Sequence, residues 1–337
     1  MLTAGFSTIG PLGWLIAQTL EAEGIDPAPL FDRAGVDLNT LRDPSVRMPS
    51  EVFHLLLEQV ELASNDPVFG LTMAKFIHPT TFYSLGIAMY CSETLGGFLD
   101  RLAKYYRLVT TNDEMVVDVQ DDCYRLRAVH VNPVEFSPVR EDGIASIVVK
   151  IIRVALHDHY EPKEVALRRS HPGEEAGEYE RFFGCKVTFD APYTEILLPV
   201  EDVARKLPSA NPVLSEMYEQ LTVEYLKKID RIDFPARVRK ELVWLLPSGV
   251  SSKEQVASAL NMSTRTLYNK LEQSGTTFRE VLDDTRHTLA DQYFRQELPI
   301  YEIAYLIGFS DTANFSRAFK KWTGVSPNDY RQQISKV

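Results

Sequence analysis

Two segments near the end of this 337-residue chain carry polar and basic side chains at the spacing of one helix face. Arginine and asparagine can each form two hydrogen bonds with a base edge, and lysine binds phosphate oxygens. The residues are Thr264, Arg265, Tyr268 and Asn269 in the first segment, and Thr312, Ala313, Asn314, Ser316, Arg317, Lys320 and Lys321 in the second. These residue types suit contact with a nucleic acid, while a solvated helix face stays the alternative for any single one of them.

The two segments belong to a duplicated unit. The sequence VASALNMS at 256–263 matches IAYLIGFS at 303–310 at a constant offset of 47 residues. After one insertion the match resumes at an offset of 48, which pairs Leu267 with Phe315 and Leu271 with Phe319. Any two amphipathic helices can resemble one such unit, but repetition of the whole pattern favours a structural unit that occurs twice.

Each unit has the residue types of a helix-turn-helix. A small residue in the first helix lets the second cross closely, and a residue that tolerates the left-handed conformation ends the first helix. A serine then caps the second helix by accepting hydrogen bonds from its unpaired N–H groups. These positions are Ala257, Asn261 and Ser263 in the first unit, and Ala304, Gly308 and Ser310 in the second.

A single long helix is predicted between the units, over residues 277–296. Its apolar positions include Phe278, Val281, Leu289 and Tyr293, at helical spacing. A helix of this length spans about 25–30 Å, close to the roughly 34 Å between successive major-groove faces of a duplex. We therefore expect a stiff connector that presents both second helices to one side of double-stranded DNA.

The charge distribution restricts nucleic-acid contact to the end of the chain. The whole sequence has a formal net charge of -11, which by itself argues against binding phosphates. Residues 1–233 hold 22 basic and 36 acidic side chains, whereas residues 234–337 hold 14 basic and 11 acidic ones. Only the last hundred residues or so are suited to approach DNA.

Residues 237–331 resemble the DNA-binding domain of the AraC/XylS family of bacterial transcription regulators. The most specific stretch is IYEIAYLIGFSDTANFSRAFKKWTGVSPNDYR, at 300–331. The family elements are present there as Ile303-Ala304, Gly308-Phe309-Ser310, Phe315, Arg317, Phe319, Lys320, Gly324, Ser326-Pro327, Tyr330 and Arg331. The resemblance implies an all-α domain with helix-turn-helix units at about 253–273 and 300–321.

The resemblance also implies that the second helix of each unit enters the major groove. The DNA-binding residues carried over are Ser263, Thr264, Arg265, Tyr268, Asn269, Thr312, Ala313, Asn314, Ser316, Arg317, Lys320 and Lys321. One of them departs from the family, which usually has arginine where this chain has Asn269. Asparagine pairs with adenine and arginine with guanine, so either the target sequence shifts or this unit reads less of it. Lys320 and Lys321 are expected on phosphates.

The preceding residues predict an α+β domain with a mainly antiparallel sheet, and not a regular βαβ alternation. Expected helices cover 12–22, 28–34, 51–63, 68–76, 139–159, 176–183 and 211–226, with one more capped by Thr94, and expected strands cover 115–119, 124–130, 164–168, 186–189 and 194–198. Asp121-Asp122 is the expected hairpin turn. The charged stretch 227–231 and Pro235 suggest a boundary between domains at 1–231 and 232–337.

This first domain is similar to the effector-binding region of one AraC-type branch, which includes ornithine-utilisation and mycobacterial virulence regulators. The similar segments include LRDPSVRMPSEVFHLLLE, FYSLGIAMYCSETLGGFLDRLAKYYRLV and YERFFGCKVTFDA. The resemblance implies a small-molecule effector, assembly as a homodimer, activation more often than repression, and RNA polymerase as a further partner. It names neither the effector nor the residues that bind it.

Other chemistry is not expected. Cys91, Cys123 and Cys185 are odd in number, and no secretory leader precedes them, so we expect a reduced bacterial cytoplasm. No stretch approaches the roughly 18 apolar residues of a membrane span. His157 and His159 point apart on a predicted helix, and no nucleophile elbow or phosphate loop is present. We therefore predict no catalytic residues, no metal site and no cofactor, and Cys185 as a small core residue.

Three functions remain open at this point. The first is a transcription regulator, more often an activator, controlled by a small-molecule effector. The second is a DNA-binding regulator whose first domain binds only protein partners, and thermal stabilisation by a metabolite would separate it from the first. The third is an enzyme fused to a DNA reader, which would turn over its ligand.

Overall fold

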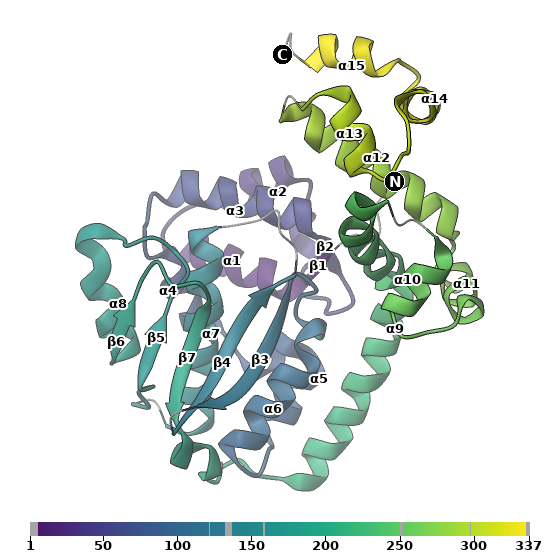
Figure 1. The fold of residues 1–337 in the computed structure, drawn as a ribbon. Coiled ribbons are helices and arrows are strands. Elements are labelled where there is room, and N and C mark those ends of the chain that lie inside the picture. Colours follow the sequence, from purple (N-terminus) through teal and green to yellow (C-terminus); the bar gives the residue numbers. More distant parts are fainter. Residues whose placement is uncertain are drawn as a thin grey trace. The chain divides into compact units, whose positions relative to one another are not determined.

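The computed structural model describes residues 6–120, 122–131, 137–157, 159–249, 252–296 and 298–334, with residues 230–233, 333 and 334 described by their backbone alone. The chain divides into two compact units, Phe6–Lys227 and Lys228–Val337 (Figure 1). Each unit has its own apolar core. None of the described helices is long and apolar enough to cross a membrane.

The first unit is the predicted α+β domain. Its helices are α1 (Gly10–Ala22), α2 (Ala28–Ala34), α3 (Ser50–Ser64), α4 (Phe69–Thr72), α5 (Tyr83–Tyr90), α6 (Leu95–Tyr105), α7 (Pro138–Ala155) and α8 (Ala176–Phe183). Thr94 caps α6, as predicted, by accepting a hydrogen bond from the Gly97 N–H. The helix expected over 68–76 divides into α4 and a 3-10 helix, Met73–Phe76, and the one expected to reach residue 159 ends at Ala155.

A five-stranded sheet forms the other layer of this unit. The strands lie in the order β3 (Asp113–Gln120), β4 (Cys123–His130), β7 (Thr194–Pro199), β5 (Glu164–Ala166) and β6 (Lys186–Thr188). All neighbours are antiparallel except β5 and β6. Helices α6 and α7 pack against the sheet (Figure 1). Of the predicted hairpin turn, Asp121 lies outside the described residues, and Asp122 has a positive φ of 57°.

A second, two-stranded sheet was not predicted. Strands β1 (Ser7–Ile9) and β2 (Arg47–Pro49) are three residues each and pair antiparallel. They are too short to show an alternation of polar and apolar residues, and their pairing joins segments about forty residues apart. Thr8 of β1 also bridges to Thr110, which brings this small sheet to the start of β3.

The helix expected over residues 211–226 is longer than predicted. Helix α9 runs without interruption over Pro212–Leu245 and includes both the charged stretch and the proline. Proline removes only one helical hydrogen bond, and the residues after it are held by burial. Phe234, Val238 and Leu242 are at most 1% exposed in the core of the second unit.

The second unit is all-α, as predicted. After α9 it contains α10 (Lys253–Ala259), α11 (Thr264–Gln273), α12 (Phe278–Arg295), α13 (Ile300–Leu306), α14 (Thr312–Thr323) and α15 (Pro327–Ile334). The predicted connector is the 18-residue α12, capped by Thr277 and Glu280, whose backbone and side chains bond reciprocally. At about 1.5 Å per residue, it is roughly 27 Å long.

Candidate nucleic-acid interface and effector cavity

The first helix-turn-helix consists of α10 and α11. Asn261 has a positive φ of 52°, so it ends the first helix in the left-handed conformation, as predicted. Ser263 caps α11 and accepts a hydrogen bond from the Thr266 N–H at 3.1 Å. Leu267 and Leu271 are each 1% exposed and fix the inner face of α11.

The outer face of α11 carries the predicted polar residues. Arg265, Tyr268 and Asn269 are exposed, and Thr264 is half-buried. Tyr268 is 61% exposed. This face therefore presents donors, acceptors and one aromatic ring together.

The second helix-turn-helix consists of α13 and α14, and its turn requires glycine. Gly308 has a φ of 76°, and a Cβ atom there would lie 2.9 Å from the Leu246 side chain and 3.2 Å from the Leu246 carbonyl oxygen. A larger residue would meet both a backbone penalty and a clash. Phe315 and Phe319, the counterparts of the two leucines, are 0% exposed.

The cap of α14 was predicted wrongly. The N-cap is Asp311, not Ser310, and its Oδ1 accepts a hydrogen bond from the Asn314 N–H at 2.7 Å. The Ser310 hydroxyl bonds instead to Asp311 Oδ2 at 3.3 Å. The extra residue that shifts the repeat from an offset of 47 to 48 falls here, so the capping position moves one residue along the chain.

The outer face of α14 carries a chain of side-chain hydrogen bonds. Asn314 Nδ2 donates to Asp311 Oδ2, and Arg317 Nη2 donates to Asn314 Oδ1 at 2.7 Å. The backbone hydrogen bond from Asn314 lowers the pKa of Asp311. The predicted residues on this helix are exposed, except that Ser316 is half-buried; the exposed ones are Thr312, Ala313, Asn314, Arg317, Lys320 and Lys321.

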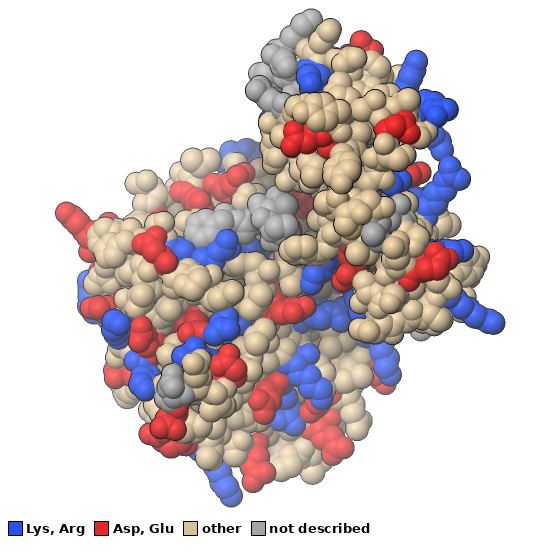
Figure 2. All heavy atoms as spheres, in the orientation of Figure 1, with Lys and Arg blue, Asp and Glu red and all other residues tan. Residues whose placement is uncertain are grey.

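Basic side chains gather where these helices lie. Figure 2 shows lysine and arginine atoms projecting along the edge of the second unit that carries α11 and α14 in Figure 1. On the visible face of the first unit, acidic and basic side chains are mixed. This distribution agrees with the charge counts of the two halves of the sequence.

Sequence reasoning missed the residue that ties the connector to the second turn. Arg286 of α12 donates from Nε to the Ile307 carbonyl oxygen at 2.9 Å and from Nη2 to the Gly308 carbonyl oxygen at 3.0 Å. Its guanidinium also lies 4.4 Å from the ring centre of Phe309. The partners are backbone atoms about twenty residues away, so no side-chain pattern could have revealed this contact. Arg286 therefore fixes the orientation of α13 on α12.

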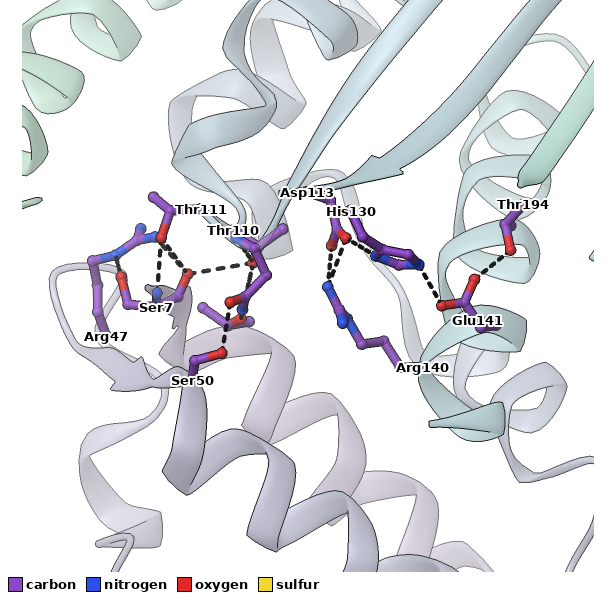
Figure 3. Close-up of polar contacts among 12 residues, drawn as sticks. Ser7, Arg47, Ser50, Thr110, Thr111, Asp113, His130, Arg140, Glu141 and Thr194 are labelled. Carbon is purple, nitrogen blue, oxygen red and sulfur yellow. Dashed lines mark hydrogen bonds and ion pairs between the residues drawn. The ribbon is translucent and has the colours of Figure 1, made fainter. Parts of the chain in front are cut away.

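The first unit contains a buried ionic cluster, defined here as Asp113, His130, Arg140 and Glu141 (Figure 3). Both oxygens of Asp113 accept hydrogen bonds from Arg140 Nη2 at 2.6 Å, and Asp113 Oδ1 also contacts His130 Nδ1. His130 Nε2 lies 2.7 Å from Glu141 Oε1, and the Thr194 hydroxyl donates to the other oxygen of Glu141. The cluster joins β3, β4, β7 and α7.

The pKa values in this cluster follow from its mutual charges. Burial acts to lower the pKa of His130, but the hydrogen bonds and charges of Asp113 and Glu141 outweigh it and raise the pKa to about 9. For Asp113, burial raises the pKa, but His130 and Arg140 outweigh it and bring the pKa below its usual value. At neutral pH His130 is therefore protonated and Asp113 is ionised.

A second buried ion pair lies beside the first on α7. Asp142 Oδ2 accepts hydrogen bonds from Arg169 Nη1 at 2.6 Å and from the Tyr179 hydroxyl at 2.8 Å. Burial raises the pKa of Asp142 to about 7, despite the charge of Arg169 and these hydrogen bonds. In the sequence, Arg140, Glu141 and Asp142 are three consecutive charges that resemble a solvated stretch, so periodicity gave no signal for their burial.

A cavity of about 60 Å³ lies next to the ionic cluster, lined by α7, α1, α3 and neighbouring segments. Its wall is mostly apolar, and its polar atoms come from Asp113, Arg140, Tyr106, Thr8 and Thr110. The apolar lining residues are Leu12, Phe53, Leu57, Met73, Phe82, Leu102, Val109, Val139, Ile144, Ile147 and Val148, with Gly143 between them.

The two cavity threonines belong to a hydrogen-bonded network. The hydroxyls of Thr8 and Thr110 lie 3.1 Å apart, and Asn112 Nδ2 donates to both. Asn112 Oδ1 in turn accepts from the Ser50 hydroxyl at 2.6 Å. This network holds β1, α3 and the start of β3 around one end of the cavity.

Two histidines and one cysteine were the candidates for metal binding or nucleophilic chemistry. His157 Nε2 lies 3.1 Å from Arg205 Nη2, and His159 is exposed. Among the described residues, no three histidine, cysteine, aspartate or glutamate side chains lie close enough together to hold a metal ion. Cys185 is half-buried against the core, and burial raises the pKa of its thiol to about 11, so it is not a reactive thiolate at neutral pH.

Both units match known protein families. Residues 24–207 match the sequence family described as the arabinose-binding domain of AraC transcription regulator, N-term, and residues 256–333 match a helix-turn-helix domain. The ornithine utilization regulator of Pseudomonas aeruginosa is 32% identical over 312 residues, which cover 92% of this chain and 91% of the relative.

Two further similarities extend over most of the chain. The regulator VirS of Mycobacterium tuberculosis is 23% identical over 94% of each chain. The solved structure of the transcriptional regulator CdpR from Pseudomonas aeruginosa has 24% sequence identity, with a TM-score of 0.49, and covers 95% of this chain and 98% of its own. The chain belongs to the AraC family of DNA-binding transcriptional regulators.

Proposed function

We propose that this regulator reads a specific DNA sequence with the outer faces of α11 and α14 and activates transcription when a small-molecule effector binds residues 6–227. The observation that carries the proposal is the repetition of one exposed polar face on the second helix of each unit. The connector α12 has the length that lets two such helices reach neighbouring major-groove faces.

Base contacts are assigned to the residues at the exposed starts of the two helices. Arg265, Tyr268 and Asn269 on α11, and Asn314 and Arg317 on α14, can reach base edges. Lys320 and Lys321, farther along α14, are assigned to phosphates. The remaining expected DNA contacts, to bases or backbone, are Ser263, Thr264, Thr312, Ala313 and Ser316. Phosphate contacts give affinity without sequence preference.

Selection of duplexes from a random pool by the full-length protein tests DNA reading directly. The selected duplex should compete at least a hundredfold better than its scrambled sequence at about 150 mM salt, since specific sites typically exceed non-specific ones by 10³ or more. Equal competition by both duplexes would refute sequence-specific reading.

Effector control is supported by the mainly apolar cavity in the first unit. The competing proposal, a first unit that binds only protein partners, leaves that cavity without a role. A small molecule that raises the melting temperature of the full-length protein and changes its affinity for the selected duplex would support control by an effector. Turnover of that molecule would instead favour an enzyme fused to a DNA reader.

Self-association is supported by apolar side chains on the first turns of α9. Val213, Met217 and Leu221 are 76%, 46% and 43% exposed and lie on one helix face. We expect a homodimer, which would present four reading helices to paired half-sites beside RNA polymerase in the bacterial cytoplasm. Leu221→Glu should lower the mass measured by light scattering to that of a monomer, whereas Leu62→Glu, at a 79% exposed position on α3, should leave it unchanged.

A further inference from the structure

The cavity beside the ionic cluster has a composition that specifies a class of ligand. We infer that it is the effector site of this regulator and that it takes a compact, mainly apolar molecule with one uncharged hydrogen-bonding group, such as a short aliphatic amide. This inference rests on the proposed control by an effector, and it assigns the site and the ligand chemistry.

Packing does not explain why the cavity is left open. Gly143 lies in the middle of the 18-residue helix α7, where glycine is about 1 kcal/mol less favourable than alanine. A Cβ atom there would meet only Met73, at 3.7–3.8 Å, which is ordinary van der Waals contact. Neither crowding nor a positive φ requires this glycine. Protein interiors contain few voids, so the space that the glycine keeps open is best explained by an occupant.

The charges at the polar end are already balanced. Arg140 and protonated His130 face Asp113 and Glu141, with contacts of 2.6 Å from Arg140 to Asp113 and 2.7 Å from His130 to Glu141. All four side chains are at most 12% exposed. A charged ligand group would add an uncompensated charge to this buried site, which is costly. The site therefore selects against carboxylates and against amino acids.

Uncharged polar groups can be accommodated. Thr8 and Thr110 line the cavity and are 2% and 5% exposed. The Thr110 hydroxyl already accepts from the backbone and side-chain N–H groups of Asn112, so the Thr8 hydroxyl is the one assigned to the ligand. A carbonyl, amide or hydroxyl group of the ligand can bond there while its hydrocarbon part contacts Leu57, Leu102 and Ile147. A volume of 60 Å³ suits a molecule on the order of five heavy atoms.

Two series of probes of equal size separate neutral from charged ligands. The full-length protein is titrated with propanamide, butanamide and pentanamide, and separately with propanoate, butanoate, pentanoate and L-ornithine, while its melting temperature is recorded. We expect the amides to raise the melting temperature, with affinity increasing about fourfold per added methylene until the cavity is full. The carboxylates and L-ornithine should produce no shift. Stabilisation by the carboxylates or L-ornithine, or by none of the probes, would overturn the proposal.

Substitutions of Gly143 locate the site. Gly143→Ala should move the preferred amide to a chain one carbon shorter, and Gly143→Leu should weaken butanamide binding at least tenfold. The matched control is Gly177→Leu on α8, where an added Cβ would meet nothing within 4 Å, and it should bind butanamide like the parent protein. If Gly143→Leu does not fold, the shift in Gly143→Ala decides. Unchanged amide preference in Gly143→Ala would place the ligand elsewhere.

The same proteins separate this inference from the proposed function. Binding of the selected duplex in the absence of amides should be the same for Gly177→Leu as for the parent. A protein that reads DNA and responds to another small molecule, but not to amides, retains effector control and refutes only the ligand class. A protein that binds amides at Gly143 without any change in DNA affinity refutes effector control and retains the site.

Discussion

The two units use charged side chains in opposite ways. In residues 228–337, Arg265 of α11 and Arg317, Lys320 and Lys321 of α14 are exposed on repeated helix faces, and apolar side chains fill the inner faces. In residues 6–227 the core contains Asp113, Arg140, Glu141 and Asp142, each at most 9% exposed. Local sequence patterns are therefore sufficient to specify an exposed polar face on a helix, whereas a buried ionic core depends on strands and helices that are far apart in the sequence.

The largest effect should come from breaking a buried pair in the first unit. Arg169→Met removes the partner of Asp142 and should lower the free energy of unfolding by about 3–5 kcal/mol. Urea unfolding at pH 7.5, followed by Trp14 fluorescence in a Trp244→Phe/Trp322→Phe background, reports on this unit.

The control for that substitution is a surface pair of the same chemistry. Arg181 Nη2 lies 2.5 Å from Glu178, and the two side chains are 72% and 46% exposed. Arg181→Met should change the free energy of unfolding by less than about 1 kcal/mol. Equal losses in the two variants would contradict the comparison of buried and exposed charges.

The second effect is a dependence of folding stability on pH, which we expect only in the first unit. The pKa of His130 is raised in the folded state to about 9, above its usual value of 6.5, so the stability it contributes is complete below pH 6.5 and is lost as pH rises through 9. Between pH 7 and 9, a range above the pKa of Asp142, the free energy of unfolding should fall by on the order of 2–3 kcal/mol.

His130→Gln should remove most of this slope in the Trp14-monitored unfolding, while the unfolding of the second unit should remain nearly flat over the same range. His54→Gln serves as the matched control, because His54 pairs with Glu58 at the surface. If the stability of His130→Gln fell with rising pH as steeply as that of the wild type, the ionic cluster would not hold a protonated histidine.

The third effect concerns DNA affinity. Arg317→Ala should weaken binding of the selected duplex by about 1–3 kcal/mol and relax preference at one base position. Lys320→Ala should weaken selected and scrambled duplexes alike and reduce the salt dependence of binding. Fluorescence anisotropy at three salt concentrations distinguishes the two. If neither change altered binding, the outer face of α14 would not be the reading surface.

The smallest effect sharpens the comparison between the two helix-turn-helix units. Ser263 caps α11, whereas Ser310 is replaced in that role by Asp311. Ser263→Ala should therefore cost about 1 kcal/mol of stability in the second unit, and Ser310→Ala less than about 0.5 kcal/mol. Urea unfolding monitored by Trp322 in a Trp14→Phe/Trp244→Phe background measures both. Equal costs would mean that the duplicated serines have the same role after all.

Much of the second unit was predictable because its determinants are local. The offset of the repeat located α10, α11, α13 and α14, and the residue types Asn261 and Gly308 marked the left-handed turns. The error at Ser310 arose at the single place where the two copies differ in length. The contacts of Arg286 with the backbone of the second turn were out of reach, because a carbonyl oxygen has no sequence signature.

The first unit was predictable only to the level of its elements. Alternation gave β3 and β4, and helical spacing gave α6, because each of these elements buries mainly one face. The sequence contained no signal for the cavity or for the cluster around His130. Those features depend on which strands become neighbours, and a strand order of β3-β4-β7-β5-β6 cannot be read from spacing along the chain.

The amino-acid sequence by itself determined the duplicated reader, the class of both units and the separation of positive from negative charge, since these follow from periodicity and residue type. Only the tertiary structure decided that three consecutive charges of α7 are buried, that α9 continues through Pro235, and that threonines from β1 and the start of β3 meet Arg140 at one cavity. The physical reason is that burial and ion pairing depend on which residues become neighbours in space. These neighbours can lie a hundred residues apart along the chain, so no single position in the sequence specifies them.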